Sequence, residues 1–405
     1  MEDNPSTGDT HWDGILENDE RVLHDDCLGR IEAMRLSAAQ AYYSLSGTLG
    51  LSRLTRVYRQ ARIDPSSPLW LLGFQYNTVH EEQLQSFPYM TYRKGFAPLM
   101  HENGLTSDAG WGCTLRVSQM LVASSVYKST CDWQERPRVC SDTVNKTAST
   151  MEAFWDVDDD ERHPLSIHSI IRHGRKFGVV PGRWMGPHVA SKSISEAIQC
   201  STGSTLRIKA HVIGCGGGAP VLYTESLKQT FATYFSQDRV AGVLILIPLV
   251  MGIGKINPVY IPQVTSLLEL EQSVGIIGGS SHSSYYFIGH QNNTLLYLDP
   301  HMVQPAALNK DSVTTFSSKT IQSMPASSMD SSASFGFLCR HEQDLDRLLS
   351  SLATIEQSYE QYPIMCVRRE GCEPPSLSME GRISMDDEGL SRLDSDGSSS
   401  SWELV

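Results

Sequence analysis

Four short apolar segments in the second half of the chain constrain its fold more than any other feature. They are β-branched or aromatic, are separated by Gly, Asn and Pro, and cover Val243–Ile247, Val274–Ile277, Tyr285–Ile288 and Leu295–Leu298. Such segments are typical of strands. Residues 291–293, between the last two segments, predict a tight hairpin turn. The longest apolar stretch, residues 240–250, contains Gly242 and Pro248 and falls short of the roughly 20 residues that span a bilayer, so it is interpreted as a buried strand.

Helical spacing of apolar residues dominates the segments that precede these strands. The expected helices cover Leu115–Tyr127, Ile167–Phe177, Ala190–Ile198 and Thr224–Phe235, and a last helix begins near Glu342. Because helices come mostly first and strands later, we expect an α+β architecture.

Composition divides the chain into three parts. Residues 1–65 begin polar and acidic and lack sustained core periodicity, so we expect a mostly flexible arm that includes a short helix. Residues 66–365 carry the ordered pattern and form the expected catalytic domain. Residues 366–405 become rich in Ser, Asp and Glu, which predicts a disordered tail.

The charge and the cysteines narrow the classes of function. The formal net charge is −13, and no Lys/Arg-rich run is present, which disfavours nucleic acid or a polybasic membrane patch as a partner. The nine cysteines are scattered and follow no signal-peptide pattern, so we expect free thiols and a cytoplasmic protein. Neither the cysteines nor the histidines have the spacing of a zinc site, and no phosphate loop is present, so no metal or cofactor is expected.

Cys113 is the cysteine with the most informative surroundings. Gly110-Trp111-Gly112 precede it and an apolar-periodic run follows, so it is predicted to lie at a helix start. The unpaired N–H groups and the positive end of the helix dipole favour a reactive thiolate there. A buried and inert cysteine is the ordinary alternative, and only a nearby base makes a nucleophile the better interpretation.

A candidate base lies at the end of the last predicted strand, in Asp299-Pro300-His301. Residues two apart on a strand face the same side, so the carboxylate and the imidazole are expected to project together. Asp299 would then orient His301, and His301 would take the proton of the thiol. By itself Asp-Pro-His is also compatible with a simple turn.

With both segments identified, the chain resembles the autophagin family, cysteine proteases that process the ubiquitin-like modifiers of autophagy. The motifs that carry this resemblance follow one another from about Pro68 to Leu352. They are Trp70-Leu71-Leu72-Gly73, Thr91-Tyr92-Arg93-Lys94-Gly95-Phe96, Thr106-Ser107-Asp108-Ala109-Gly110-Trp111-Gly112-Cys113, Ser166-Ile167-His168, Trp184-Met185-Gly186-Pro187, Gly275-Ile276-Ile277-Gly278-Gly279, Tyr297-Leu298-Asp299-Pro300-His301 and Phe335-Gly336-Phe337.

The resemblance implies a papain-like fold with a small additional helical subdomain, and it implies Cys113, Asp299 and His301 as the catalytic triad. It also implies that the Tyr92 hydroxyl donates to the oxyanion, a role for which the residues alone give no indication. Trp184 and the loop Gly278-Gly279-Ser280-Ser281 would cover the active site. Ser281 stands where many family members carry proline, which predicts a more flexible lid.

The last four residues, Trp402-Glu403-Leu404-Val405, follow the acidic tail as an aromatic-x-x-aliphatic sequence. Such a peptide can add a strand to the sheet of a ubiquitin-like modifier while Trp402 and Val405 fill two pockets. The resemblance therefore predicts a modifier-interacting motif.

Together these features predict a cysteine endopeptidase that cleaves an autophagy modifier after a C-terminal glycine. It would trim the precursor and release the modifier from phosphatidylethanolamine, so it would approach autophagic membranes transiently through its substrate. Two alternatives stay open at this point: a general papain-like peptidase or deubiquitinase, and a non-catalytic scaffold that binds modifiers through Trp402.

Overall fold

The computed structural model describes residues 34–43, 61, 63–76, 87–99, 104–130, 151–201, 206–214, 218–237, 240–281, 283–317 and 320–370. All of them belong to one unit, residues 1–370. Residues 371–405 lie outside the described residues, so the interaction motif predicted at Trp402 and Val405 stays a prediction.

Nine strands of the described residues form one sheet. Its main path runs in the order β11 (Gln322–Pro325), β9 (Thr294–Leu298), β8 (Ser283–Gln291), β7 (Ser273–Ser280), β12 (Asp330–Cys339), β6 (Gly242–Lys255) and β4 (Ile208–Val212). The short strands β1 (Leu69–Leu71) and β2 (Phe74–Tyr76) join it through β8. Neighbours on the path are antiparallel except β4 and β6, which are parallel.

Two smaller pairs of parallel strands complete the β-structure: β3 (Arg93–Lys94) with β10 (Gln304–Pro305), and β5 (Val221–Tyr223) with β13 (Cys366–Arg368). The second pair shows that ordered structure extends to Glu370, beyond the predicted boundary at residue 365. Backbone pairing with β5 orders Cys366–Arg368, although the local composition there already changes toward that of the tail.

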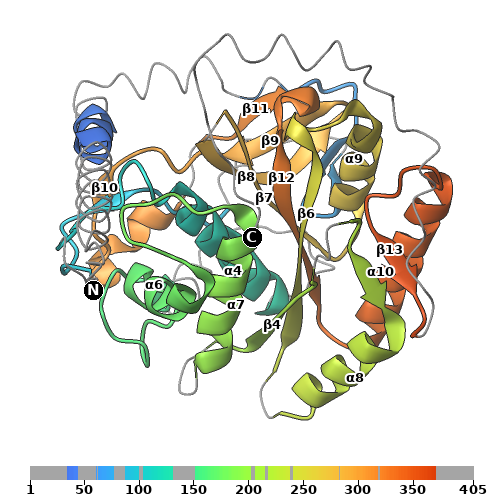
Figure 1. The fold of residues 1–405 in the computed structure, drawn as a ribbon, viewed down its shortest axis with the longest axis horizontal. Helices are drawn as coiled ribbons and strands as arrows, with labels where there is room; N and C mark the ends of the chain where they lie inside the picture. Colours follow the sequence, from blue (N-terminus) through green and yellow to red (C-terminus); the bar gives the residue numbers. More distant parts are fainter. Residues whose placement is uncertain are drawn as a thin grey trace, which may run out of the picture. The chain divides into compact units, whose positions relative to one another are not determined.

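Helices cover both faces of the sheet (Figure 1). On one face lie α4 (Cys113–Thr130), α6 (Ile167–Gly174) and α7 (Pro187–Cys200), and on the other lie α8 (Thr224–Phe235), α9 (Ile261–Glu269) and α10 (Glu342–Ser358). The 3-10 turns are η1 (Arg175–Phe177), η2 (Pro258–Tyr260), η3 (Lys310–Phe316) and η4 (Ala326–Ser328). Residues 34–43 are also helical.

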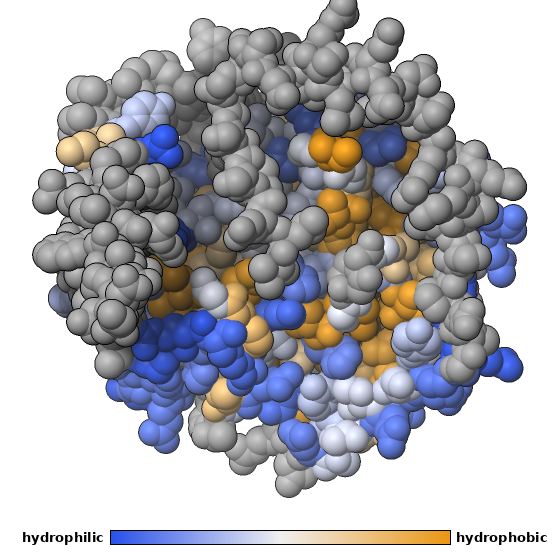
Figure 2. Space-filling model, viewed as in Figure 1, coloured by the Kyte–Doolittle hydropathy of each residue, from blue (hydrophilic) through white to orange (hydrophobic). Residues whose placement is uncertain are grey.

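Strand β6 shows why the central strands are apolar along their whole length. Leu244 and Leu246 belong to the core cluster beneath α4, α6 and α7, whereas Val243, Ile245 and Ile247 belong to the cluster beneath α8, α9 and α10. Alternate side chains therefore enter two different cores, and both faces of the strand are buried. The same view in space-filling form shows apolar side chains over the part of the sheet where β6 and β12 lie (Figure 2).

The predicted helices and strands are found, most of them with longer bounds. The helix expected over Ile167–Phe177 is an α-helix only to Gly174 and continues as η1. The helix expected over Thr224–Phe235 has those bounds, and each of the four predicted strands lies within an observed one. The turn predicted at 291–293 connects β8 and β9, with Asn292 at φ 52°. Strand β12 contains the Phe335-Gly336-Phe337 motif but is not among the predicted strands, because its first five residues are mostly polar. No helix among the described residues is long and apolar enough to cross a membrane.

Candidate active site

Cys113 opens helix α4, as predicted. The Arg116 N–H donates to the Gly112 carbonyl at 3.0 Å, so the first helical turn closes around the cysteine. Position 112 requires glycine because a Cβ there would lie 2.6 Å from Asp108 Oδ2. The positive potential at a helix start favours the thiolate form of the side chain.

Asp299 and His301 meet directly after β9. Their side chains lie 2.6 Å apart, between His301 Nδ1 and Asp299 Oδ1, and the His301 backbone N–H donates to the same oxygen at 2.9 Å. Because Asp299 occupies Nδ1, Nε2 is left for the hydrogen bond between His301 and Cys113. The structure therefore brings the three predicted triad residues into one connected chain.

Tyr92 is fixed to the same segment through its backbone. Its N–H donates to the Pro300 carbonyl at 3.0 Å, and its carbonyl accepts from the Gln304 N–H at 2.9 Å. The phenol is buried and forms a hydrogen bond with Cys113. Burial first, and then the charge of Cys113, raise the pKa of Tyr92 well above its ordinary value, so the hydroxyl keeps its proton and can donate it.

The electrostatics favour an ion pair between thiol and imidazole. Burial raises the pKa of Cys113, but the hydrogen bond and positive charge of His301, together with hydrogen bonds from Ser284, outweigh burial and lower this pKa to about 7. Burial lowers the pKa of His301, but Asp299 and Cys113 outweigh it and raise this pKa to about 10. Between these two values the pair exists as thiolate and imidazolium, the form that nucleophilic attack requires.

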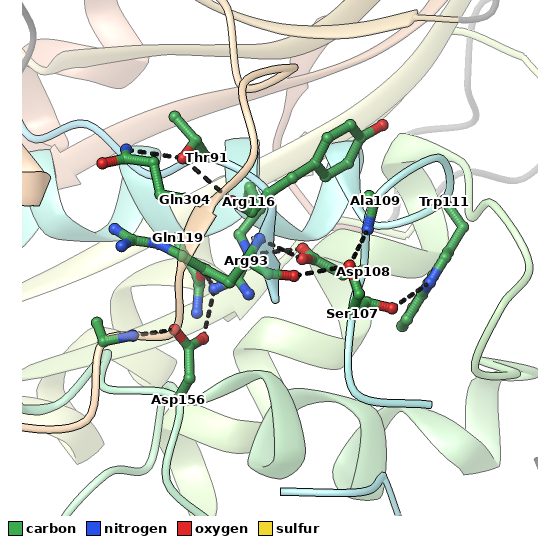
Figure 3. Close-up of polar contacts among 12 residues, drawn as sticks. Thr91, Arg93, Ser107, Asp108, Ala109, Trp111, Arg116, Gln119, Asp156 and Gln304 are labelled. Carbon is green, nitrogen blue, oxygen red and sulfur yellow. Dashed lines mark hydrogen bonds and ion pairs between the residues drawn. The ribbon is translucent and has the colours of Figure 1, made fainter. Parts of the chain in front are cut away.

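A buried network of charges holds the segment before Cys113 (Figure 3). Arg116 lies between two carboxylates, with Nε 2.7 Å from Asp108 Oδ2 and Nη1 2.7 Å from Asp156 Oδ1. Asp108 also accepts from the Arg93 N–H at 2.6 Å, and Asp156 accepts from the Ala307 N–H at 2.9 Å. The network therefore joins the nucleophile segment to the segments that follow Tyr92 and His301.

Trp184 is 50% exposed and is linked to the surroundings of Cys113 through Ser284. Its Nε1 donates to the Ser284 hydroxyl at 3.3 Å, and Ser284 is 2% exposed. The indole therefore presents one edge to solvent and its N–H to a buried serine.

The predicted glycine loop is mostly strand. Gly278, Gly279 and Ser280 belong to β7 and pair with β8, so the connection between the two strands is only two residues long. Ser281 has φ 53°, a conformation that proline cannot adopt, and its N–H donates to Asp330 Oδ1 at 3.0 Å, a bond that proline cannot make. The serine thus permits a turn geometry that differs from one containing proline.

Gly279 lies in a strand for a steric reason. A Cβ at this position would lie 2.6 Å from the Ser283 carbonyl oxygen, so only glycine allows strands β7 and β8 to approach this closely. A glycine pair in a sequence indicates a loop more often than a tight strand pairing, which is why the sequence predicts a loop here.

The chain matches the catalytic domain of peptidase C54 over residues 77–351. A cysteine protease ATG4a of Arabidopsis thaliana is 31% identical to it in an alignment of 330 residues, with 72% of this chain and 69% of the relative covered. The ATG4b protease of the same plant is 28% identical, with 84% of this chain and 77% of the relative covered. A probable cysteine protease atg4 of Aspergillus oryzae is 31% identical, with 63% and 67% covered.

The chain belongs to the peptidase C54 family. The family resemblance predicted from the sequence motifs is thereby confirmed, and so are the α+β, papain-like fold and the cysteine-type peptidase activity. In this C54 peptidase, helices α6 and α7 pack against each other beside α4. All three helices contribute to the same core cluster. Among its described residues, no group of His, Cys, Asp and Glu could hold a metal ion.

In this C54 peptidase, sequence reasoning missed one residue that contacts the Asp299 carboxylate. Gln322, at the start of β11, donates from Nε2 to Asp299 Oδ2 at 3.3 Å, and its Oε1 accepts from the Tyr297 hydroxyl at 3.1 Å. Tyr297 thereby orients the amide so that its N–H₂ faces Asp299. The register that aligns Gln322 with Tyr297 across β9 and β11 is a tertiary feature.

Sequence reasoning also missed Tyr43, which lies near the N-terminus of this C54 peptidase. Tyr43, at the end of the helix at residues 34–43, stacks on His301 with ring centroids 5.9 Å apart and packs edge-on against Tyr92 at 5.2 Å. The aromatic pair Tyr42-Tyr43 was the only sequence signal, and nothing in it indicates contact with a histidine 258 residues away.

Proposed function

We propose that this C54 peptidase cleaves ubiquitin-like modifiers of autophagy on the carboxyl side of a C-terminal glycine. The observation that carries the proposal is the connected chain Asp299–His301–Cys113, with the protonated Tyr92 hydroxyl on the same sulfur. The names of the relatives, cysteine protease ATG4, and the motifs that resemble the autophagin family support this choice of substrate.

In the first step the Cys113 thiolate attacks the carbonyl carbon of the terminal glycine. The carbonyl oxygen becomes an oxyanion, and the Tyr92 hydroxyl and the Cys113 N–H stabilise it. His301 gives its proton to the leaving amine while the bond between the carbonyl carbon and the amine nitrogen breaks. A thioester between the modifier and Cys113 remains.

In the second step water hydrolyses the thioester. His301, now neutral, takes a proton from the water, and the resulting hydroxide attacks the thioester carbonyl. The second tetrahedral intermediate forms at the same oxyanion site, and its collapse returns Cys113 as a thiolate and the modifier with a free glycine carboxyl group, which loses its proton to solvent. Asp299 keeps the imidazole oriented in both steps.

The leaving amine distinguishes the two reactions that we propose for the same site. In precursor trimming it is the amino group of the residue that follows the glycine, and in delipidation it is the amine of phosphatidylethanolamine. We further infer that the substrate enters between Trp184, which donates to Ser284, and the β7–β8 turn. An entry too narrow for a larger side chain would explain the choice of glycine.

The remaining parts of the proposal concern partners and location. We place the enzyme in the cytoplasm, in line with the free thiols of the described cysteines Cys113, Cys200, Cys339 and Cys366. The lipid-conjugated substrate brings the enzyme to autophagic membranes. Trp402 and Val405 would add a second contact with the modifier.

Purified protein and a Cys113→Ala variant test the proposal. Each is incubated with an autophagy modifier extended beyond its terminal glycine, with the same modifier conjugated to phosphatidylethanolamine in vesicles, and with extended ubiquitin. The Cys200→Ala variant is the matched control, since Cys200 is exposed and its pKa is raised by burial first and then by Glu196. We expect loss of cleavage by about 10⁴-fold or more in Cys113→Ala only.

Two outcomes of this assay would contradict the proposal. Equal cleavage of ubiquitin and of the autophagy modifiers would identify a general peptidase or deubiquitinase and reject the proposed substrate. Full activity of Cys113→Ala would reject the proposed nucleophile.

A further inference from the structure

Ser284 is a buried hydroxyl beside the nucleophile for which the proposed mechanism has no role. It lies on β8 opposite Gly279, where β8 packs on the start of α4. Its oxygen is 2.7 Å from the hydroxyl oxygen of Thr114 and accepts from Trp184 Nε1 at 3.3 Å. It thus connects the residue that follows Cys113 with the exposed indole.

The hydrogens around Ser284 can be assigned from chemistry. A serine hydroxyl has one hydrogen and two lone pairs, and an indole nitrogen can only donate. Trp184 therefore occupies one lone pair of Ser284. When the Thr114 hydroxyl donates to the other lone pair, the hydrogen of Ser284 is free for a third partner. The Ser284 side chain also acts on Cys113, and a thiolate attracts the free hydrogen more strongly than a neutral hydroxyl does.

We propose that Ser284 is a further catalytic residue, which donates its hydrogen to the Cys113 thiolate and links that thiolate to the Trp184 indole. This inference rests on Cys113 being the nucleophile of the proposed function. Both the hydroxyl and the backbone N–H of Ser284 lower the pKa of Cys113, in agreement with the hydrogen assignment.

The link has a consequence for the cover of the active site. While Trp184 donates to Ser284, the indole N–H polarises the serine hydroxyl and strengthens its bond to sulfur. A substrate that displaces Trp184 removes this contribution. The indole therefore prepares the nucleophile before the substrate arrives.

The pH dependence of alkylation at Cys113 is the measurement that separates this role from a structural one. Several other titratable groups face the thiol or its partners from the surrounding elements. They are His301 and Asp299 after β9, Tyr92 before β3, Tyr43 from the helix at 34–43, Tyr285 from β8 and Asp108 before α4. All of them stay unchanged in the variants below, so the comparison isolates the serine.

Iodoacetamide labelling is followed at the Cys113 peptide by mass spectrometry as a function of pH, on the full chain. The plateau rate reports access to the sulfur, whereas the midpoint reports its pKa, so a loosened cover cannot mimic the effect. In Ser284→Ala we expect the midpoint to rise by about one pH unit, which lowers the thiolate fraction at pH 7 by about fivefold. Ser284→Thr keeps the hydroxyl and should restore the midpoint.

Two further variants test the connection to Trp184. Trp184→Phe keeps an aromatic cover without the N–H and should raise the midpoint by a smaller amount, about 0.3 pH unit. Combined with Ser284→Ala it should add no further rise, because the indole acts through the serine. Ser283→Ala, on the opposite face of β8, is the matched control and should leave the midpoint unchanged.

An unchanged midpoint in Ser284→Ala would overturn the proposal. It would also be overturned if Trp184→Phe shifted the midpoint equally in the unchanged protein and in Ser284→Ala. Because labelling is read at the thiol and not through proteolysis, this result is independent of the substrate assay. Failure of Cys113→Ala to lose activity would reject the proposed function instead.

Discussion

The inner residues of the candidate active site and the residues that cover it are held in different ways. The inner cluster, Cys113, Asp299, His301 and Tyr92, is at most 18% exposed, and both oxygens of Asp299 accept hydrogen bonds. The residues that we propose as its cover are Tyr43, Trp184 and Ser281. Trp184 is half exposed and is tied to the inner part through its indole N–H, and Ser281 is exposed.

This difference separates two requirements of the enzyme. Groups that stabilise a developing charge have to be in place before the reaction, so the inner cluster is fixed by buried bonds from several segments. Groups that admit a substrate have to move, so they are attached by individual contacts of small energy. The variants that follow change one side of this comparison at a time, in order of decreasing expected effect.

Asp299→Asn removes the charge that orients the base and should have the largest effect. The neutral amide offers a hydrogen instead of a lone pair on one side, so His301 loses its preferred tautomer and the stabilisation of its positive form. We expect kcat to fall by about 10⁴-fold, as the same replacement does in serine protease triads. Cleavage of the extended modifier measures it.

Asp311→Asn provides the control for this carboxylate-to-amide change, because Asp311 is exposed at the start of η3. Its activity should equal that of the unmodified chain. Retention of a tenth of the activity by Asp299→Asn would contradict the role of Asp299.

Arg116→Met tests whether the inner part depends on the charge network. Burial raises the pKa of Asp108, and Arg116 is the strongest influence that opposes it, so the variant leaves two buried carboxylates without their cation. We expect the free energy of unfolding to fall by about 3–5 kcal/mol. Urea denaturation measures this loss.

Arg162→Met is the matched control on the surface. Arg162 also contacts a carboxylate, Glu152 at 3.0 Å, but its side chain is 66% exposed. Its loss should cost at most about 1 kcal/mol.

The double variant Arg116→Met/Asp108→Asn should be more stable than Arg116→Met alone, because one of the two unpaired buried charges is gone. An equal or lower stability would argue against the network.

The sequence predicts the reactive groups of the inner cluster but not their supports. Cys113 and His301 are each recognised locally, one from glycines ahead of an apolar helix and the other from a carboxylate two residues away at a strand end. The two carboxylate partners of Arg116 lie eight residues before it and forty residues after it. Only the packing of the segment around Asp156 beside α4 brings the second carboxylate near.

The sequence predicts the structure of the proposed cover even less well. Gly278 and Gly279 predict a loop because glycine tolerates any backbone conformation, whereas here it permits close pairing with β8. Tyr43 lies in a polar and acidic region without core periodicity, and its contact with His301 depends on where a short helix packs. Local patterns carry no information about such packing.

Gln322→Leu tests the second oxygen of Asp299. The leucine fills a similar volume but cannot donate, so Asp299 keeps its bond to His301 and loses the one at Oδ2. Loss of a hydrogen bond to a charged group costs about 1.5 kcal/mol at the lower end, so kcat should fall by about tenfold. KM should not change, because Gln322 lies behind the carboxylate, away from the substrate.

Tyr297→Phe is the companion variant, since it removes only the hydroxyl that orients Gln322. Its effect on kcat should be smaller and should vanish in the Gln322→Leu background. Additive effects of the two changes would show that Tyr297 acts by another route.

Tyr43→Ala removes a part of the cover and should have the smallest effect. Its ring stacks on His301, and such aromatic contacts contribute about 0.5–1.5 kcal/mol, so Cys113 should react with iodoacetamide about two- to tenfold faster at the plateau.

Burial first, and then Cys113, raise the pKa of Tyr43 to about 12, so the phenol is neutral between pH 7 and 10, where the ion pair exists. Removing a neutral ring opens the site without changing the charge around the sulfur. The plateau should therefore rise while the midpoint stays near 7, the opposite of the result expected for Ser284→Ala. Tyr42→Ala, at the 66% exposed neighbour, should change neither quantity; a shifted midpoint in Tyr43→Ala would show that this part of the cover acts on the chemistry as well as on access.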